Sequence, residues 1–183
     1  TYTPGGQLLC AERSMQAETC AIYILAGDQP QWIGRHAASV TVLEALDEQI
    51  VLSAGRDARA ALWNIAGRSL LREQRLADWP RAACLSPDRA RLLLLHHSLE
   101  LIDCQTLGAR LMFSSGRIDG AGRSVLRSAT FLPEKDQILA GQFNGNVIHY
   151  QHGGNRIRAR LLTQHPKPVE CVLVLPQRPA VAT

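Results

Sequence analysis

The 183-residue sequence predicts an all-β fold built from repeated groups of short strands. Two observations lead to this prediction. Apolar stretches are only a few residues long, and turn-forming groups such as Ala54-Gly55-Arg56-Asp57 and Asn144-Gly145 separate them. In addition, no stretch of a dozen residues keeps the 3.6-residue apolar period of an amphipathic helix. Many short strands joined by regular turns are typical of sandwiches, barrels and propellers.

Internal repetition favours a propeller among these architectures. Three segments share one order of strand, polar turn, apolar strand, tight turn and third strand: residues 40–63, 82–103 and 128–150. Their closing residues are Trp63, Asp103 and Tyr150, which stand 40 and 47 residues apart. This spacing brackets the period of about 40–45 residues that is typical of four-stranded propeller blades.

A fourth strand-like stretch follows each segment, at residues 69–75, 109–114 and 156–162. An incomplete copy precedes the first segment, and another begins at Val169. The sequence thus predicts one β-propeller region over residues 1–183, with about four blades visible and partial repeats at about residues 1–34, 35–75, 81–114, 126–162 and 165–183. Since so few blades do not close a ring, we expect them to form part of a larger ring, either in a longer chain or as a half-propeller completed by another chain.

Specific residues in the first complete repeat carry a family resemblance. Ser53-Ala54-Gly55-Arg56-Asp57 forms a small-Gly-x-Asp turn, Leu62-Trp63-Asn64 closes the repeat, and Arg35-His36 precedes it. These positions resemble the Gly-His pair, the turn and the Trp-Asp ending of WD40 repeats. The resemblance implies that His36, Ser53, Asp57 and Trp63 form a buried, hydrogen-bonded structural network. Such a network would offset the cost of burying a carboxylate and an indole N–H.

The other repeats depart from this pattern. The second has His96-His97-Ser98 at the turn and ends in Ile102-Asp103, whereas the third has residues 141–145 at the turn and ends in Tyr150. The order of strands and turns therefore resembles WD40 repeats along the whole chain, whereas the specific motif residues occur in one repeat. A propeller of a related but distinct family stays open as an alternative.

Composition narrows the functional classes. The net charge of +4 comes almost entirely from scattered arginines, which says little about nucleic acid. Apolar runs are far shorter than the ~20 residues that a membrane-spanning helix needs, so no membrane is expected. No signal peptide is visible, and because the chain begins at Thr1 we expect an N-terminal segment to be missing.

The five cysteines form no CxxC pair. An odd number of cysteines on apolar runs favours buried thiols in the cytoplasm or another reducing intracellular compartment. We therefore expect no metal site and no cofactor.

Two groups of residues could suggest catalysis or metal binding. His36, Ser53 and Asp57 contain the residue types of a catalytic triad, but the chain has no Gly-x-Ser-x-Gly nucleophile elbow, and the resemblance makes them structural. His96 and His97 would point to opposite faces if they lay on a strand, so a turn or a strand end explains them better than a metal site. The chain is therefore not expected to be an enzyme.

Two further groups are candidate partner contacts. Arg117, Asp119 and Arg123 lie in a glycine-rich loop over residues 116–124, which joins two blades. Arg156, Arg158 and Arg160 alternate with apolar residues, so they share one face of an outer strand. The favoured explanation is that such charges discourage edge-to-edge aggregation, and binding of an acidic partner or RNA is the alternative. No aromatic residues interleave with them to stack bases, which disfavours nucleic acid.

The resemblance to WD40 repeats implies a non-enzymatic scaffold that binds other protein subunits within a larger complex. No small-molecule substrate is expected. Two alternatives stay open. One is a ligand-binding or enzymatic propeller with a site in its central channel, and the other is RNA binding through the Arg156–Arg160 strip. Trp32 and Trp79 lie outside the network and could be either contact residues or buried between blades.

Overall fold

The computed structural model describes residues 1–14, 19–27, 29–113, 124–133, 136–153 and 156–174. The chain forms two compact units, Thr1–Ser114 and Ser115–Thr183. Every regular element in the described residues is a β-strand, which confirms the all-β prediction. This part of the chain contains no helix long and apolar enough to span a membrane.

The first unit contains three antiparallel sheets. One sheet has three strands, β1 (Leu9–Ala11), β2 (Cys20–Ala26) and β3 (Gln29–His36). The second has the order β4 (Val40–Ala45), β5 (Ile50–Gly55), β6 (Arg59–Asn64) and β7 (Ser69–Arg75). The third contains β8 (Ala82–Leu85), β9 (Arg91–Leu95), β10 (Leu99–Asp103) and β11 (Ala109–Phe113), again in sequence order.

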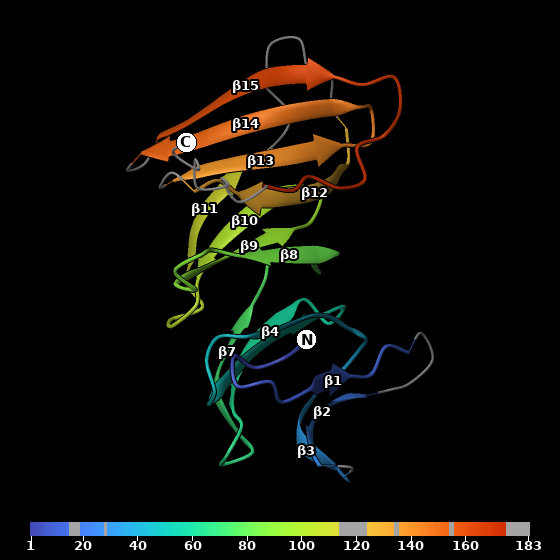
Figure 1. Cartoon of the computed structure of the whole chain (residues 1–183), viewed down its shortest axis with the longest axis vertical. Helices are drawn as coiled ribbons and strands as arrows, with labels where there is room; N and C mark the ends of the chain where they lie inside the picture. Colours follow the sequence, from blue (N-terminus) through green and yellow to red (C-terminus); the bar gives the residue numbers. More distant parts are fainter. Residues whose placement is uncertain (15–18, 28, 114–123, 134–135, 154–155, 175–183) are drawn as a thin grey trace, which may run out of the picture. The chain divides into compact units, whose positions relative to one another are not determined.

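The second unit contains one four-stranded sheet (Figure 1). Its strands are β12 (Leu126–Phe131), β13 (Gln137–Gln142), β14 (Asn146–Gly153) and β15 (Arg156–Gln164). As in the other sheets, each strand pairs with the next one in the sequence, because short turns join antiparallel neighbours. β15 is therefore the outermost strand of its sheet.

The core of the first unit follows from the two-residue period of β-strands. On one face of the β4–β7 sheet, Val51 and Trp63 pack into a cluster with apolar side chains of β2 and β3. On the opposite face, Leu52 and Leu62 pack into a second cluster with leucines of β9. Because successive residues serve opposite faces, β5 and β6 have nearly continuous apolar sequences, and the sheet is covered on both sides.

Two predicted boundaries differ from the structure. β3 extends to His36, so the Arg35-His36 pair ends a strand instead of standing between strands. The repeat predicted to begin at Val169 forms no strand over residues 165–174, which the structure describes. Even so, the Val169 N–H donates to the Gln142 carbonyl at 3.0 Å, as the Val40 N–H donates to the Glu12 carbonyl at 3.3 Å. Val169 thus lies beside the end of β13. In the same way, Val40, the first residue of β4, lies beside the end of β1.

Two glycines allow close approaches that the packing needs. Gly145 has a φ of 88°, and the chain after β15 returns so close to it that a Cβ would overlap the His165 carbonyl. Gly34 on β3 lies flat against the six-membered ring of Trp63 on β6. A Cβ at either position would force the backbone or the ring to move.

The contact between Gly34 and Trp63 gives a first prediction. We expect Gly34→Ala to destabilise the chain by about 1–3 kcal/mol, because the added methyl group overpacks a filled core. Thermal or urea unfolding measures the change. The control is Gly153→Ala, since a Cβ at Gly153 would meet no atom within 4 Å. Equal stabilities of the two variants would contradict the packing described for Trp63.

Candidate functional site

The structure brings His36, Ser53, Asp57 and Trp63 together in one continuous chain of hydrogen bonds. The Trp63 indole N–H donates to Ser53 Oγ at 2.7 Å. His36 Nε2 lies 2.8 Å from Ser53 Oγ, and His36 Nδ1 lies 3.0 Å from both carboxylate oxygens of Asp57. His36 and Ser53 are fully buried. The four residues come from β3, β5, the β5–β6 turn and β6, so the network joins two sheets.

The donors and acceptors fit in only one direction. The Asp57 carboxylate can only accept, so Nδ1 of His36 carries a hydrogen. Nε2 of the neutral ring then accepts the Ser53 hydroxyl hydrogen, and Ser53 Oγ accepts the Trp63 N–H. Every polar atom between Trp63 and Asp57 is thus satisfied with a neutral His36. The network fixes the positions of the side chains and leaves no exposed nucleophile, because Ser53 is fully buried.

Gly55 is required at the turn beside this network. A Cβ at Gly55 would lie 2.8 Å from the Ser39 carbonyl oxygen, 3.1 Å from His36 Nδ1 and 3.2 Å from Asp57 Oδ1. The Arg56 N–H also donates to the Ser39 carbonyl at 2.8 Å, which draws the two backbones together. The turn motif therefore needs glycine at this position because any side chain would crowd the neighbouring backbone and the network.

The Asp57 carboxyl has a pKa below its ordinary value. Burial alone would raise this pKa, but the hydrogen bond from His36, the Ala37 N–H and the positive charge of Arg59 together lower it. The ionised form is the one that these donors stabilise. Asp57 thus contributes stability above the pKa that it has in the unfolded chain. This contribution is lost as the pH falls through the lower folded pKa.

A second prediction follows from this pH dependence. At pH 7 we expect Asp57→Asn to lower the free energy of unfolding by about 1–3 kcal/mol, because an amide replaces a charged acceptor. The difference from the wild-type chain should begin to shrink below a pH of about 4, where the carboxyl of the unfolded chain becomes protonated, and it should be lost fully only below the lower folded pKa. Thermal unfolding followed by circular dichroism between pH 3 and 7 measures both effects. The exposed Glu48→Gln variant is the control, and a pH-independent difference would rule out a role for the Asp57 charge.

The other repeats replace the network with different contacts. His96 and His97 lie in the turn between β9 and β10, where His97 is exposed and His96 Nε2 lies 2.9 Å from Glu100 Oε2 in the interior. In the second unit, Tyr150 occupies the closing position, and burial raises its pKa to about 12. Within the described residues, no three His, Cys, Asp or Glu side chains are placed to hold a metal ion.

Arg158 and Arg160 are exposed on β15 and share one face of the second unit's sheet. The register pairs Arg160 with His149 and Arg158 with Gln151 of β14, and Gln151 with Gln137 of β13. Antiparallel partners lie on the same side of a sheet, so five polar side chains gather there. We call this set, Gln137, His149, Gln151, Arg158 and Arg160, the arginine face. Arg156 begins β15 opposite Gly153.

Hydrogen bonds orient the groups of the arginine face. Arg160 Nε donates to His149 Nδ1 at 3.3 Å, so Nδ1 carries no hydrogen. His149 Nε2 therefore carries it and donates to Gln137 Oε1 at 2.7 Å. The Gln137 amide N–H groups have no hydrogen-bond partner among the described residues. Together with the two guanidinium groups, they give the face an excess of donors.

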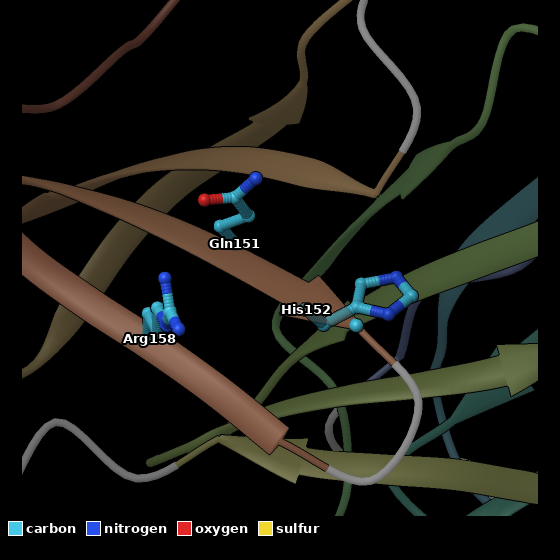
Figure 2. Close-up of a pocket in the computed structure, with 4 residues that line it drawn as sticks. Gln151, His152 and Arg158 are labelled. Carbon is cyan, nitrogen blue, oxygen red and sulfur yellow. The ribbon is translucent and has the colours of Figure 1, made fainter.

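The arginine face is hollowed. A cavity of about 500 Å³ is lined by the five residues of the face and Ala159. A smaller one of about 260 Å³ adjoins Gln151, His152, Gly153 and Arg158. Figure 2 shows Gln151 and Arg158 projecting from neighbouring strands on the same side of the sheet. No acidic side chain is among the described residues that line these cavities.

Sequence reasoning found the two arginines but missed Gln137, His149 and Gln151. The signal was available in the hairpin that joins β14 and β15. Counting outward from the Gly153–Arg156 pair places Gln151 opposite Arg158. The other predicted contacts, Arg117, Asp119 and Arg123, lie outside the described residues.

The tryptophans outside the network differ in their surroundings. Trp32 on β3 is 50% exposed. Trp79 is half-buried, and the guanidinium groups of Arg56 and Arg81 lie 4.7 and 5.3 Å from its ring centre. Both distances are within the range of cation–π contacts. Trp79 is therefore held against its own chain, whereas half of the Trp32 surface remains accessible.

Comparison with known proteins supports the fold alone. No protein-family model and no curated protein matches the sequence. Among solved structures, 1018 chains match, and one of them is the structure of U3-55K, a WD40 β-propeller protein. That match has a TM-score of 0.61 and 15% sequence identity, and it covers 74% of this chain and 42% of the other. The chain therefore has a WD40-like β-propeller fold, as predicted, and it spans less than half the length of that structure.

Proposed function

We propose that this chain is a non-enzymatic scaffold that binds other protein subunits, and that the arginine face is one of its contact surfaces. The observation that carries the proposal is the excess of donors on an exposed, hollowed sheet face. Among the described residues, the Arg158 guanidinium has no hydrogen-bond or ion-pair partner. A guanidinium with unused donors is suited to bind a carboxylate in a bidentate manner.

The chemistry of such a scaffold is binding without bond making. An acidic segment of a partner would place carboxylates against Arg158 and Arg160 and fill the hollow over Gln151. The hydrogen bond from Arg160 to His149 supports this function, because it orients the Arg160 side chain in the absence of a partner. Pre-organised side chains lose less entropy when they bind. The structure buries only Cys20 and Cys104 of the five cysteines, so the prediction of buried thiols is wrong for the other three. A reducing intracellular compartment remains part of the proposal because of the odd number of cysteines in the sequence.

The third prediction tests this proposal with a charge reversal. The chain is expressed at its native level with an affinity tag and purified together with its partners, which mass spectrometry identifies and quantifies. We expect partners in stoichiometric amounts. We also expect the Arg158→Glu/Arg160→Glu variant to bind at least one of them about tenfold more weakly, because like charges then face each other. Titration of that purified partner measures the affinity.

The matched control reverses Arg75, an exposed arginine at the end of another outer strand, β7. Arg75→Glu should leave the affinity unchanged. Recovery of the chain alone would overturn the scaffold function. Unchanged binding by the double variant would overturn the role of the arginine face. Salt-dependent binding of RNA that the double variant loses would replace a protein partner with a nucleic acid.

A further inference from the structure

A second hollow lies in the first unit, between the β4–β7 and β8–β11 sheets. Its volume is about 520 Å³, which is within the usual range of ligand pockets. It shares no residue with the arginine face. We call it the interblade hollow and define its floor by Leu46, Ile50, Leu62 and Cys104.

The floor of the interblade hollow is apolar. Leu62 and Cys104 belong to the buried cluster between the two sheets, and Leu46 and Ile50 pack against that cluster. Burial, together with nearby carboxylates, raises the pKa of the Cys104 thiol to about 12, so the thiol stays protonated at neutral pH and behaves as an apolar group. An aliphatic side chain from a ligand would therefore find no charged group on this floor.

A bulge in β7 brings Leu71 to the mouth of the hollow. The register pairs Leu62 with Arg72 and Trp63 with Leu70, which leaves Leu71 as the extra residue. Such bulges redirect side chains. Leu71 is 51% exposed, although leucine gains free energy when it is buried. A ligand side chain seated on the floor would cover it.

Four charged groups line the mouth, and within the described part of the chain three of them have hydrogen-bond partners. Asp47 accepts two backbone N–H groups of its own turn. Asp88 accepts the Ser86 hydroxyl and one backbone N–H, and Arg89 donates to two carbonyls at the end of β4. Arg72 is exposed, and among the described residues its guanidinium has no hydrogen-bond or ion-pair partner. The group left to recognise a ligand is therefore a cation beside an apolar floor.

The outer strand limits the shape of the ligand. All seven residues of β7 are exposed, and β7 is the edge of its sheet. The backbone groups along this edge can pair with an extended segment. Such a segment, running along β7, would present alternate side chains, two residues apart, to the floor and to Arg72.

We propose that the interblade hollow binds an extended segment of a partner protein in which an acidic residue follows an aliphatic one two positions later. The aliphatic side chain lies on the floor beside Leu71, and the carboxylate pairs with Arg72. This site is additional to the arginine face and does not depend on it, because the two surfaces belong to different sheets.

The fourth prediction uses two short probe peptides, acetyl-Ser-Leu-Ser-Asp-Ser-amide (the Leu-Asp peptide) and acetyl-Ser-Leu-Ser-Lys-Ser-amide (the Leu-Lys peptide). Each is titrated into the ¹⁵N-labelled chain, and amide chemical shifts are followed. We expect the Leu-Asp peptide to shift amides of Ile50, Leu71, Arg72 and Cys104 and to bind about tenfold more tightly than the Leu-Lys peptide. Arg72→Glu should reverse this preference, and Leu71→Ser should weaken both peptides.

The controls come from the same strand. Arg75→Glu and Leu70→Ser alter exposed residues of β7 that do not line the hollow, and they should bind like the wild-type chain. Equal affinity for the two peptides, a preference that Arg72→Glu does not change, or no shift at these amides with about 5 mM peptide would overturn the proposal. The Arg158→Glu/Arg160→Glu variant should keep the Leu-Asp site, so failure of the arginine face leaves this result intact.

Discussion

The covering of the β4–β7 sheet on both faces is the constraint on which the rest of the first unit depends. A strand has two faces, and here both are apolar, so the sheet is stable only between two neighbours. Trp63 and Leu62 are adjacent in the sequence, yet they belong to different clusters. The hydrogen-bonded network lies on the Trp63 side, and the interblade hollow lies on the Leu62 side. Each feature forms where the β4–β7 sheet packs against a neighbouring sheet.

The second unit uses the same strand order for a different surface. One face of its sheet carries Ile138, Ile148 and Tyr150, which are buried. The other carries the arginine face, although Val169 already covers one end of that side by packing against Gly141. On the β4–β7 sheet the position that corresponds to His149 is Leu62, which packs into the core. A side that is apolar in one blade is therefore polar in the other, and what covers it must supply polar or charged groups.

Much of the fold could be predicted from the sequence because the information is local. Short apolar stretches and turn residues define strands, and the spacing of Trp63, Asp103 and Tyr150 gives the repeat. The four network residues could be named because a family pattern fixes them along the chain. The arginine face was found only in part, since Gln137 and His149 look like ordinary strand residues until the register between strands is known. The interblade hollow has no linear motif, because its lining comes from strands and turns of two repeats.

The Gly34–Trp63 contact has a consequence for how such a chain can change over evolutionary time. Gly34 belongs to one repeat and Trp63 to the next, and the bulk of the ring is possible only because its neighbour has no side chain. Duplicating or exchanging a repeat as a block of sequence would separate the two and place a ring against an unfitted surface. The unit that must be inherited together is thus the contact between two successive repeats. A substitution on one side of this contact has to be matched by one on the other side.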